Sequence, residues 1–71
     1  MDRHHVESSA LQSVGYDPEK RILELKFRED GVWQYFSFPP SAYKKFKRAT
    51  SLGHYFVTKI KGKYPEIRVG Q

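Results

Sequence analysis

The stretch ILELKFREDGVWQYFSF, residues 22–38, decides the fold of this chain. From Ile22 to Arg28 apolar and charged side chains alternate, which is the period-two pattern of a half-buried strand. Asp30-Gly31 follows, and an Asp-Gly pair between two such runs is a strong hairpin signal, because both central residues of the matching turn need positive φ. The stretch therefore predicts an antiparallel hairpin.

The length of the hairpin loop decides which side chains share a face. A two-residue loop sets the leucines of the first strand against Phe36 and Phe38. The other face then interleaves cations with flat rings, as in a stacking platform for unpaired bases, through Lys26, Arg28, Trp33 and Tyr35. A three-residue loop with a bulge would instead move Trp33 and Tyr35 to the side of Leu25 and Phe27. We favour the two-residue loop, and whether the two rings face solvent or core stays open at this point.

A third strand is expected before the hairpin, over residues 6–16. Its alternation breaks between Leu11 and Val14, which indicates a bulged or irregular strand. Asp17-Pro18 then closes it, because these residue types are favoured at the first two positions of a type I turn. Residues 1–5 are expected to be a disordered N-terminus.

Two helices are expected after the hairpin. Pro39-Pro40 ends the sheet and suits the first turn of a helix over residues 41–49. Its apolar side chains recur at helical spacing, and they are Ala42, Phe46 and Ala49. Ser51 is typical of the N-cap of a second helix, Gly62 of its end, and its apolar positions fall four apart at Leu52, Phe56 and Ile60. The tail over residues 64–69 is expected to be extended, with a short added strand as an alternative.

Composition and these patterns predict one α+β domain over residues 1–71. The expected fold is a three-stranded antiparallel meander followed by two short C-terminal helices packed on one sheet face. The 71 residues include no cysteine, which excludes a disulfide framework and a cysteine-ligated zinc site. Because no signal peptide or membrane span is visible, we expect a soluble, cytoplasmic protein. No cofactor or metal is expected, since His4 and His5 lack a third ligand nearby.

The charge is divided unevenly along the chain. Residues 1–38 carry a net charge of −2 and residues 39–71 carry +7, which together give the overall +5. Clustered cations attract phosphate backbones without regard to sequence and in a salt-sensitive manner. Aromatic residues make up 15% of the chain, and such rings both fill a core and stack on bases. The composition therefore favours RNA or a single-stranded nucleic acid as the partner.

Two groups of residues are candidates for that contact. The first joins the platform to the cations of the second half, and it comprises Lys26, Arg28, Trp33, Tyr35, Lys44, Lys45, Lys47, Arg48, Lys59, Lys61 and Lys63. The second is the start of the second helix, where free amides can hold a phosphate, at Ser51, Gly53 and His54. Each group also has a purely structural explanation: core filling for the rings, a solvated face for the cations, and helix capping for the serine.

Other functions are weighed against nucleic-acid binding. The chain has no cysteine nucleophile, no Gly-rich phosphate loop, no paired carboxylates on one element and no histidine cluster, so we do not expect an enzyme. The alternative is a protein-interaction module whose basic half docks an acidic partner. A third interpretation is that the charge serves solubility alone. A monomer or a weak dimer is expected, because a sheet with an open edge can pair with a second copy.

The order of motifs resembles the KTSC domain family. In the first half the resemblance rests on Ser8-Ser9, Val14-Gly15-Tyr16-Asp17, residues 23–27, Gly31, Trp33-Gln34-Tyr35 and Phe38-Pro39. In the second half it rests on residues 51–56, Ile60, Gly62 and Tyr64. It extends from about Val6 to Val69, and the shared order and spacing are more specific than any single motif.

The resemblance also carries an expectation about function. The family is named for a short domain at the C-terminus of some lysyl-tRNA synthetases, and it also occurs as small free-standing bacterial proteins. Its function is not established, and RNA binding is the usual suggestion. This sequence departs from the family at Trp33, where the family has a tyrosine. The change keeps a stacking ring and loses one phenolic hydroxyl.

Overall fold

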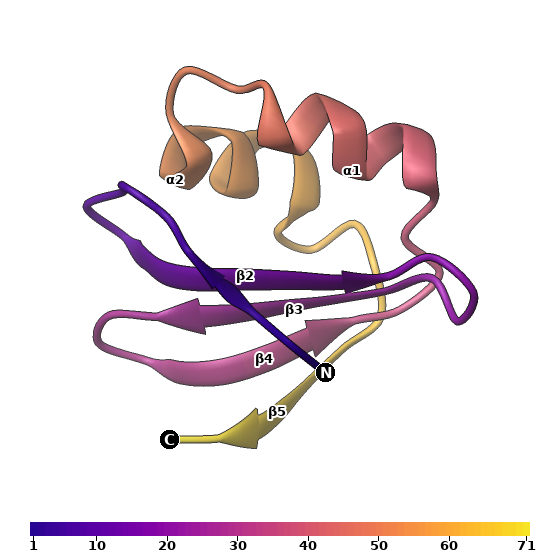
Figure 1. Cartoon of the computed structure of the whole chain (residues 1–71), viewed down its shortest axis with the longest axis horizontal. Coiled ribbons are helices and arrows are strands. Elements are labelled where there is room, and N and C mark those ends of the chain that lie inside the picture. The colour runs from indigo at the N-terminus through magenta and orange to yellow at the C-terminus, as the bar shows by residue number, and fades with distance from the viewer.

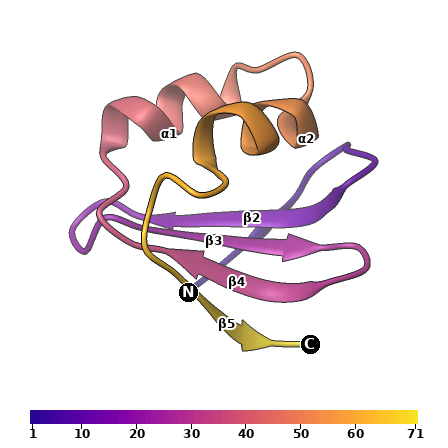
Figure 2. The same cartoon turned by 180° about the vertical axis from the view of Figure 1, so that it is seen from behind.

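The computed structural model describes all 71 residues as a five-stranded antiparallel sheet with helices on one face (Figures 1 and 2). Strand order in the sheet follows the sequence: β1 (His4–His5), β2 (Leu11–Asp17), β3 (Ile22–Phe27), β4 (Gly31–Tyr35) and β5 (Glu66–Gly70). Between β4 and β5 the chain forms the helical layer: α1 (Pro40–Lys47), α2 (Leu52–Tyr55) and the π-helical segment η1 (Phe56–Ile60).

The prediction of a three-stranded meander is wrong, because a further strand extends the sheet at each edge. β1 pairs with β2, and β5 returns after the helices to pair with β4. Neither strand has a buried face, so neither shows the alternation of apolar and polar residues that predicts a strand. Both residues of β1 are exposed, and β5 is exposed from Glu66 to Val69. The chain is nevertheless α+β, as predicted.

The N-terminal residues, for which the sequence predicted disorder, lie across the sheet face that the helices leave uncovered (Figure 1). A methyl group on Gly15 would come within 2.4 Å of the Asp2 carbonyl oxygen, so this glycine permits the close approach. Arg3 forms an ion pair with Glu24, which is only 6% exposed. The Glu24 carboxylate also accepts a 2.8 Å hydrogen bond from Gln34. A buried charge is thus fully partnered under the N-terminal residues.

The loop between β3 and β4 has three residues, not the two that we favoured. Phe27 pairs with Gly31 and Leu25 pairs with Trp33, which leaves residues 28–30 as the loop. Gly31 has a φ of 79°, as in hairpins where a turn is followed by a left-handed glycine. The three-residue alternative is therefore the correct one. It places Trp33 and Tyr35 on the leucine face, beneath the helices.

The core lies between the leucine face and the helical layer. Tyr35 and Phe38 are both buried although they are three residues apart, because Ser37 adopts a φ of 59° and breaks the strand alternation between them. The helices contribute Phe46 of α1 and Ile60 of η1. Eight residues form the buried cluster: Leu11, Val14, Leu23, Leu25, Tyr35, Phe38, Phe46 and Ile60.

The second helix begins where the sequence predicts and changes type midway. The hydroxyl of Ser51 accepts a hydrogen bond from the amide of His54 at 3.2 Å, which confirms the N-cap. After Tyr55 the backbone widens into η1, where the Lys61 amide donates to the Phe56 carbonyl at 2.8 Å. Gly62, with a φ of 75°, follows the end of the segment. None of the helices has both the length and the apolar character needed to cross a membrane.

Candidate functional site

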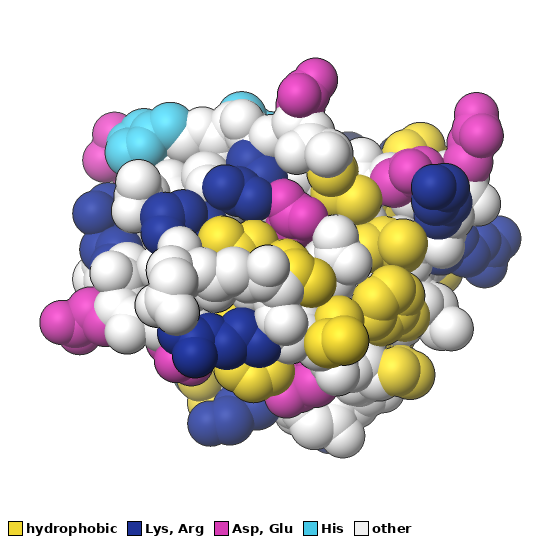
Figure 3. All heavy atoms as spheres, turned by 90° about the horizontal axis from the view of Figure 1, so that it is seen from below, with side chains coloured by type: hydrophobic (Ala, Val, Ile, Leu, Met, Phe, Trp, Pro, Cys, Tyr) yellow, Lys and Arg dark blue, Asp and Glu magenta, His cyan; other side chains and the backbone are white.

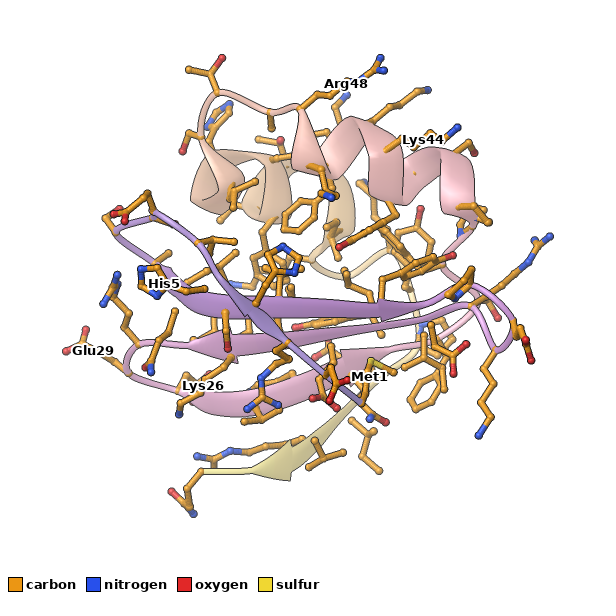
Figure 4. All side chains as sticks on the ribbon, in the orientation of Figure 1. Met1, His5, Lys26, Glu29, Lys44 and Arg48 are labelled. Atoms are coloured by element: carbon orange, nitrogen blue, oxygen red, sulfur yellow. The ribbon has the colours of Figure 1, made fainter.

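The helical layer carries a one-sided charge. All seven of its cationic side chains are exposed, and no acidic residue lies between Pro39 and Pro65. None of the seven takes part in a salt bridge. Figure 4 shows two of them, Lys44 and Arg48, pointing away from the sheet. We call this set the basic layer: Lys44, Lys45, Lys47, Arg48, Lys59, Lys61 and Lys63.

The packing of α1 determines which way its cations point. Phe46 is completely buried and contacts the Tyr55 ring at a centroid distance of 5.7 Å. Tyr43 stacks on Tyr16, with ring centroids 4.4 Å apart and planes 14° apart. Because these side chains anchor one side of α1, Lys44 and Lys45 occupy the other. Lys47 reaches back over the Tyr43 ring, with its Nζ 5.6 Å from the ring centroid. Lysines in the last turn also complement the helix dipole, which is a structural contribution independent of any ligand.

The four residues of the predicted stacking platform are not together. Trp33 and Tyr35 lie on the leucine face, whereas Lys26 is opposite Val32 on the other face and donates to the Gln71 carbonyl at 3.1 Å. Arg28 is in the loop, and its Nε donates to the Ser8 carbonyl at 2.8 Å. The open platform that followed from a two-residue loop is therefore wrong. A contact of any one of these residues with a nucleic acid stays a prediction.

The start of α2 has its own structural explanation. Ser51 is engaged as the N-cap of α2, as described above. A methyl group on Gly53 would come within 3.1 Å of the Ala10 side chain, so the glycine lets α2 approach the chain just before β2. His54 is exposed, and its backbone amide is the group that Ser51 caps. Phosphate binding by these residues stays a prediction.

A pocket of ≈ 200 Å³ lies where the β3–β4 hairpin, η1 and the start of β5 meet. We call it the aromatic pocket, because the rings of Phe27, Trp33 and Phe56 form its walls. The Phe27 and Phe56 rings meet edge to face, with centroids 5.0 Å apart. The Trp33 indole is held in place, since its Nε1–H donates to the Asp30 carbonyl at 3.0 Å.

The polar groups of the aromatic pocket are Tyr35, two carboxylates and one lysine. Tyr35 is 2% exposed, and no hydrogen bond within the protein engages its hydroxyl. No polar side-chain atom is fully enclosed without a partner, so this hydroxyl must open into the pocket that the residue lines. Burial, with a smaller effect from the carboxylates of Glu66 and Asp30, raises the pKa of Tyr35 far above its usual value. Lys61 lines the same pocket.

The raised pKa of Tyr35 predicts a loss of stability at alkaline pH. In the unfolded chain this phenol ionises near pH 10, whereas in the folded protein it stays protonated well above that. The unfolded state therefore binds fewer protons above about pH 10, and stability is complete below that pH and falls as pH rises. Above about pH 10, we expect the free energy of unfolding of the Tyr35→Phe variant to fall less steeply than that of the unmodified protein, by up to about 1.4 kcal/mol per pH unit. Urea denaturation at neutral and alkaline pH measures the difference, and parallel losses in the two proteins would contradict it.

Sequence reasoning missed four of the residues in the aromatic pocket. The sequence pattern places Phe27 on the apolar strand face, Phe56 in the helical spacing, Asp30 in a turn and Glu66 in an extended tail. No local signal in the sequence joins them, because they meet only through the hairpin register and the return of β5 beside β4.

The side of the molecule away from the helices is more apolar than the basic layer. Figure 3 shows hydrophobic side chains gathered there, and Met1, Ile67 and Val69 are each about half exposed. A second depression, of ≈ 570 Å³, is lined by residues of the N-terminus and of the β2–β3 turn. Of its polar side chains, Tyr16, Asp17 and Gln34 are hydrogen-bonded within the protein, and Asp2 and Lys20 are exposed. Unlike the aromatic pocket, it therefore has no unpartnered hydroxyl or carboxylate on a buried residue.

Known proteins resemble this chain along most of its length. A profile of the KTSC domain matches residues 7–64. An uncharacterized protein of Stutzerimonas stutzeri is 41% identical over 56 residues, which cover 79% of each chain. The crystal structure of a KTSC domain protein from Yersinia pestis matches with a TM-score of 0.95 and 43% identity, over 97% of both chains. A lysine–tRNA ligase of Nostoc punctiforme is 33% identical over 58 residues, which cover 82% of this chain and 10% of the ligase.

Proposed function

This chain belongs to the KTSC domain family, and we propose that it is a binding module that holds the phosphate backbone of RNA, or of another single-stranded nucleic acid, on its basic layer. One observation carries the proposal: seven exposed cations lie between Pro39 and Pro65, a segment of the chain that contains no acidic residue. Like charges at neighbouring helical positions repel one another, and a bound polyanion removes that cost. A surface that served only solubility would mix both signs.

The name of one relative supports an RNA partner. This relative is named a lysine–tRNA ligase, so its substrate is an RNA by name, and this domain corresponds to a tenth of that protein. A domain that accompanies an RNA-using enzyme fits a partner of the same chemistry. For this chain the charge of the basic layer is the main support for an RNA partner.

The salt dependence of RNA binding tests the proposal. Each phosphate neutralised by a cation releases counterions, so the slope of log K against log salt reports the number of contacts. We expect a fluorescently labelled single-stranded RNA to bind at about 50 mM salt and to dissociate steeply toward about 200 mM. The double variant Lys44→Gln/Lys45→Gln should make the slope shallower by about 1.4, at about 0.7 per cation. Fluorescence anisotropy measures both quantities.

A matched control removes the same charge elsewhere. Lys20 and Arg21 are exposed in the β2–β3 turn, so the variant Lys20→Gln/Arg21→Gln has the same net charge as the α1 variant. We expect this control to keep the slope of the unmodified protein. Equal effects of the two variants, or no binding at low salt, would contradict the proposal. Binding of polyglutamate as tight as that of RNA would instead favour an acidic protein partner.

A further inference from the structure

The aromatic pocket has the chemistry of a ligand site that the basic layer alone does not explain. Buried polar groups normally find partners inside the protein, because an unpaired one costs free energy. Tyr35 is 98% buried as a residue, but its hydroxyl has no partner in the protein and is not fully enclosed, so it opens toward the pocket that the residue lines. A ligand with complementary polar atoms would satisfy it.

The walls and size of the pocket favour one flat ring system. The rings of Phe27, Trp33 and Phe56 surround a space of ≈ 200 Å³. That volume is below the roughly 300–1,000 Å³ of pockets that hold drug-sized molecules. Aromatic side chains are the usual surfaces on which unpaired bases stack in single-stranded nucleic acids.

The polar groups select the kind of base. The carboxylates of Asp30 and Glu66 only accept hydrogen bonds, so together they favour a ring that presents two N–H donors, as an exocyclic amino group does. The Tyr35 hydroxyl can donate to a carbonyl or ring nitrogen of the same ligand. Guanine, adenine and cytosine all present an exocyclic amino group, whereas uracil in a nucleotide has a single N–H donor, at N3.

Positive charge beside the pocket favours a phosphate-bearing ligand over a simple cation. Lys61 belongs both to the pocket and to the basic layer, and Lys59 and Lys63 are its neighbours in the chain. The guanidinium of Arg68 lies beside Gly31, the residue that follows Asp30 in the chain. These cations offset the two carboxylates and repel a free guanidinium or ammonium ion.

We propose that the aromatic pocket binds one unpaired nucleobase with an exocyclic amino group, while Lys61 contacts the adjoining phosphate. The assignment rests on the nucleic-acid function proposed above and gives it a base preference. The basic layer would supply affinity that is independent of sequence, and the pocket would select guanine, adenine or cytosine over uracil.

Trp33 provides the test, because it is the only tryptophan and lines the pocket. Its fluorescence is followed while the whole protein is titrated with GMP, AMP, CMP and UMP. We expect the three amino-bearing nucleotides to quench it with affinities about tenfold above that of UMP. Equal affinity for UMP, or no quenching by any nucleotide, would overturn the proposal. So would N-acetylarginine amide binding more tightly than every nucleotide, because the pocket would then be a cation site.

Two variants and a control assign the effect to particular groups. Glu66→Gln replaces a pocket carboxylate by an amide of the same shape, and we expect the advantage over UMP to fall several-fold. Tyr35→Phe keeps the ring and removes the unpartnered hydroxyl, so it should weaken binding of the amino-bearing nucleotides. Glu29→Gln is the control, because Glu29 lies outside the pocket and points away from the molecule (Figure 4). Unaltered selectivity in both pocket variants would rule the assignment out.

The two proposals fail in different ways. If the pocket proposal alone is wrong, RNA still binds with a salt slope that depends on Lys44 and Lys45, while Glu66→Gln and Glu29→Gln behave alike. If the basic layer is not a nucleic-acid surface, labelled RNA does not bind at low salt, whatever the mononucleotides do to Trp33.

Discussion

Replacing Phe46 with alanine is expected to lower the free energy of unfolding by about 3–5 kcal/mol. Phe46 is the fully buried residue of α1 and part of the central cluster, so the change removes a large apolar surface and leaves a cavity. A domain of this size has a total stability near the lower end of the usual range of about 5–15 kcal/mol. The variant should therefore be largely unfolded or close to it. Urea denaturation followed by far-UV circular dichroism measures the loss.

A neighbouring residue on the same helix provides the control. Lys45 is exposed, so Lys45→Ala should change stability by no more than about 0.5 kcal/mol. Phe46→Leu retains most of the apolar volume, and it keeps the comparison measurable if the alanine variant does not fold. A cost below about 1 kcal/mol for Phe46→Ala would mean that α1 is held by other contacts. Such a result would also weaken the inference that Phe46 directs Lys44 and Lys45 outward.

Local sequence signals were sufficient where one residue type determines the backbone. The strand from Ile22, the N-cap at Ser51 and the end of the second helix near Gly62 are all where the sequence predicts them. In each case the physical cause is local, either alternation, a capping hydroxyl or a left-handed glycine. These elements position α1 and α2, and with them most of the basic layer.

The hairpin register was not determined by local signals. Gly31 suits the second position of a two-residue turn and equally the left-handed position that follows a three-residue loop. Burial separates the two arrangements, because only the second places Tyr35 in the core beside Leu23. Regular strand alternation would place Tyr35 and Phe38 on opposite faces, yet both are buried. The break between them at Ser37 depends on a positive φ, which serine rarely adopts, so the sequence does not predict it.

Part of the candidate site could likewise be predicted from local sequence signals, and part could not. The cations of the basic layer could be identified from charge alone, because long charged side chains without acidic neighbours remain on the surface. The aromatic pocket could not, because Glu66 reaches it only when β5 pairs with β4, 31 residues after that strand ends at Tyr35. An exposed edge strand leaves little trace of its position in the sequence.

Adding a methyl group at Gly31 is expected to cost about 2–5 kcal/mol of stability and to displace β5. The φ of 79° contributes about 1–2 kcal/mol of backbone strain for any residue with a Cβ. In addition, the new carbon would lie 2.4 Å from the Gly70 carbonyl oxygen, and such overpacking adds about 1–3 kcal/mol. Since the clash is with backbone, β5 has to move for the methyl group to fit.

The control variant Gly62→Ala separates the cost of backbone strain from the cost of the clash with β5. Gly62 has nearly the same φ, 75°, but nothing lies within 4 Å of the position a Cβ would take. This control should therefore lose only the strain of about 1–2 kcal/mol. Hydrogen exchange should show faster exchange of the β5 amides in Gly31→Ala and unchanged exchange in Gly62→Ala. If the two variants lose equal stability, β5 accommodates the methyl group without cost. If β5 does move, Glu66 leaves the aromatic pocket, so Gly31→Ala should also reduce the preference of Trp33 quenching for amino-bearing nucleotides.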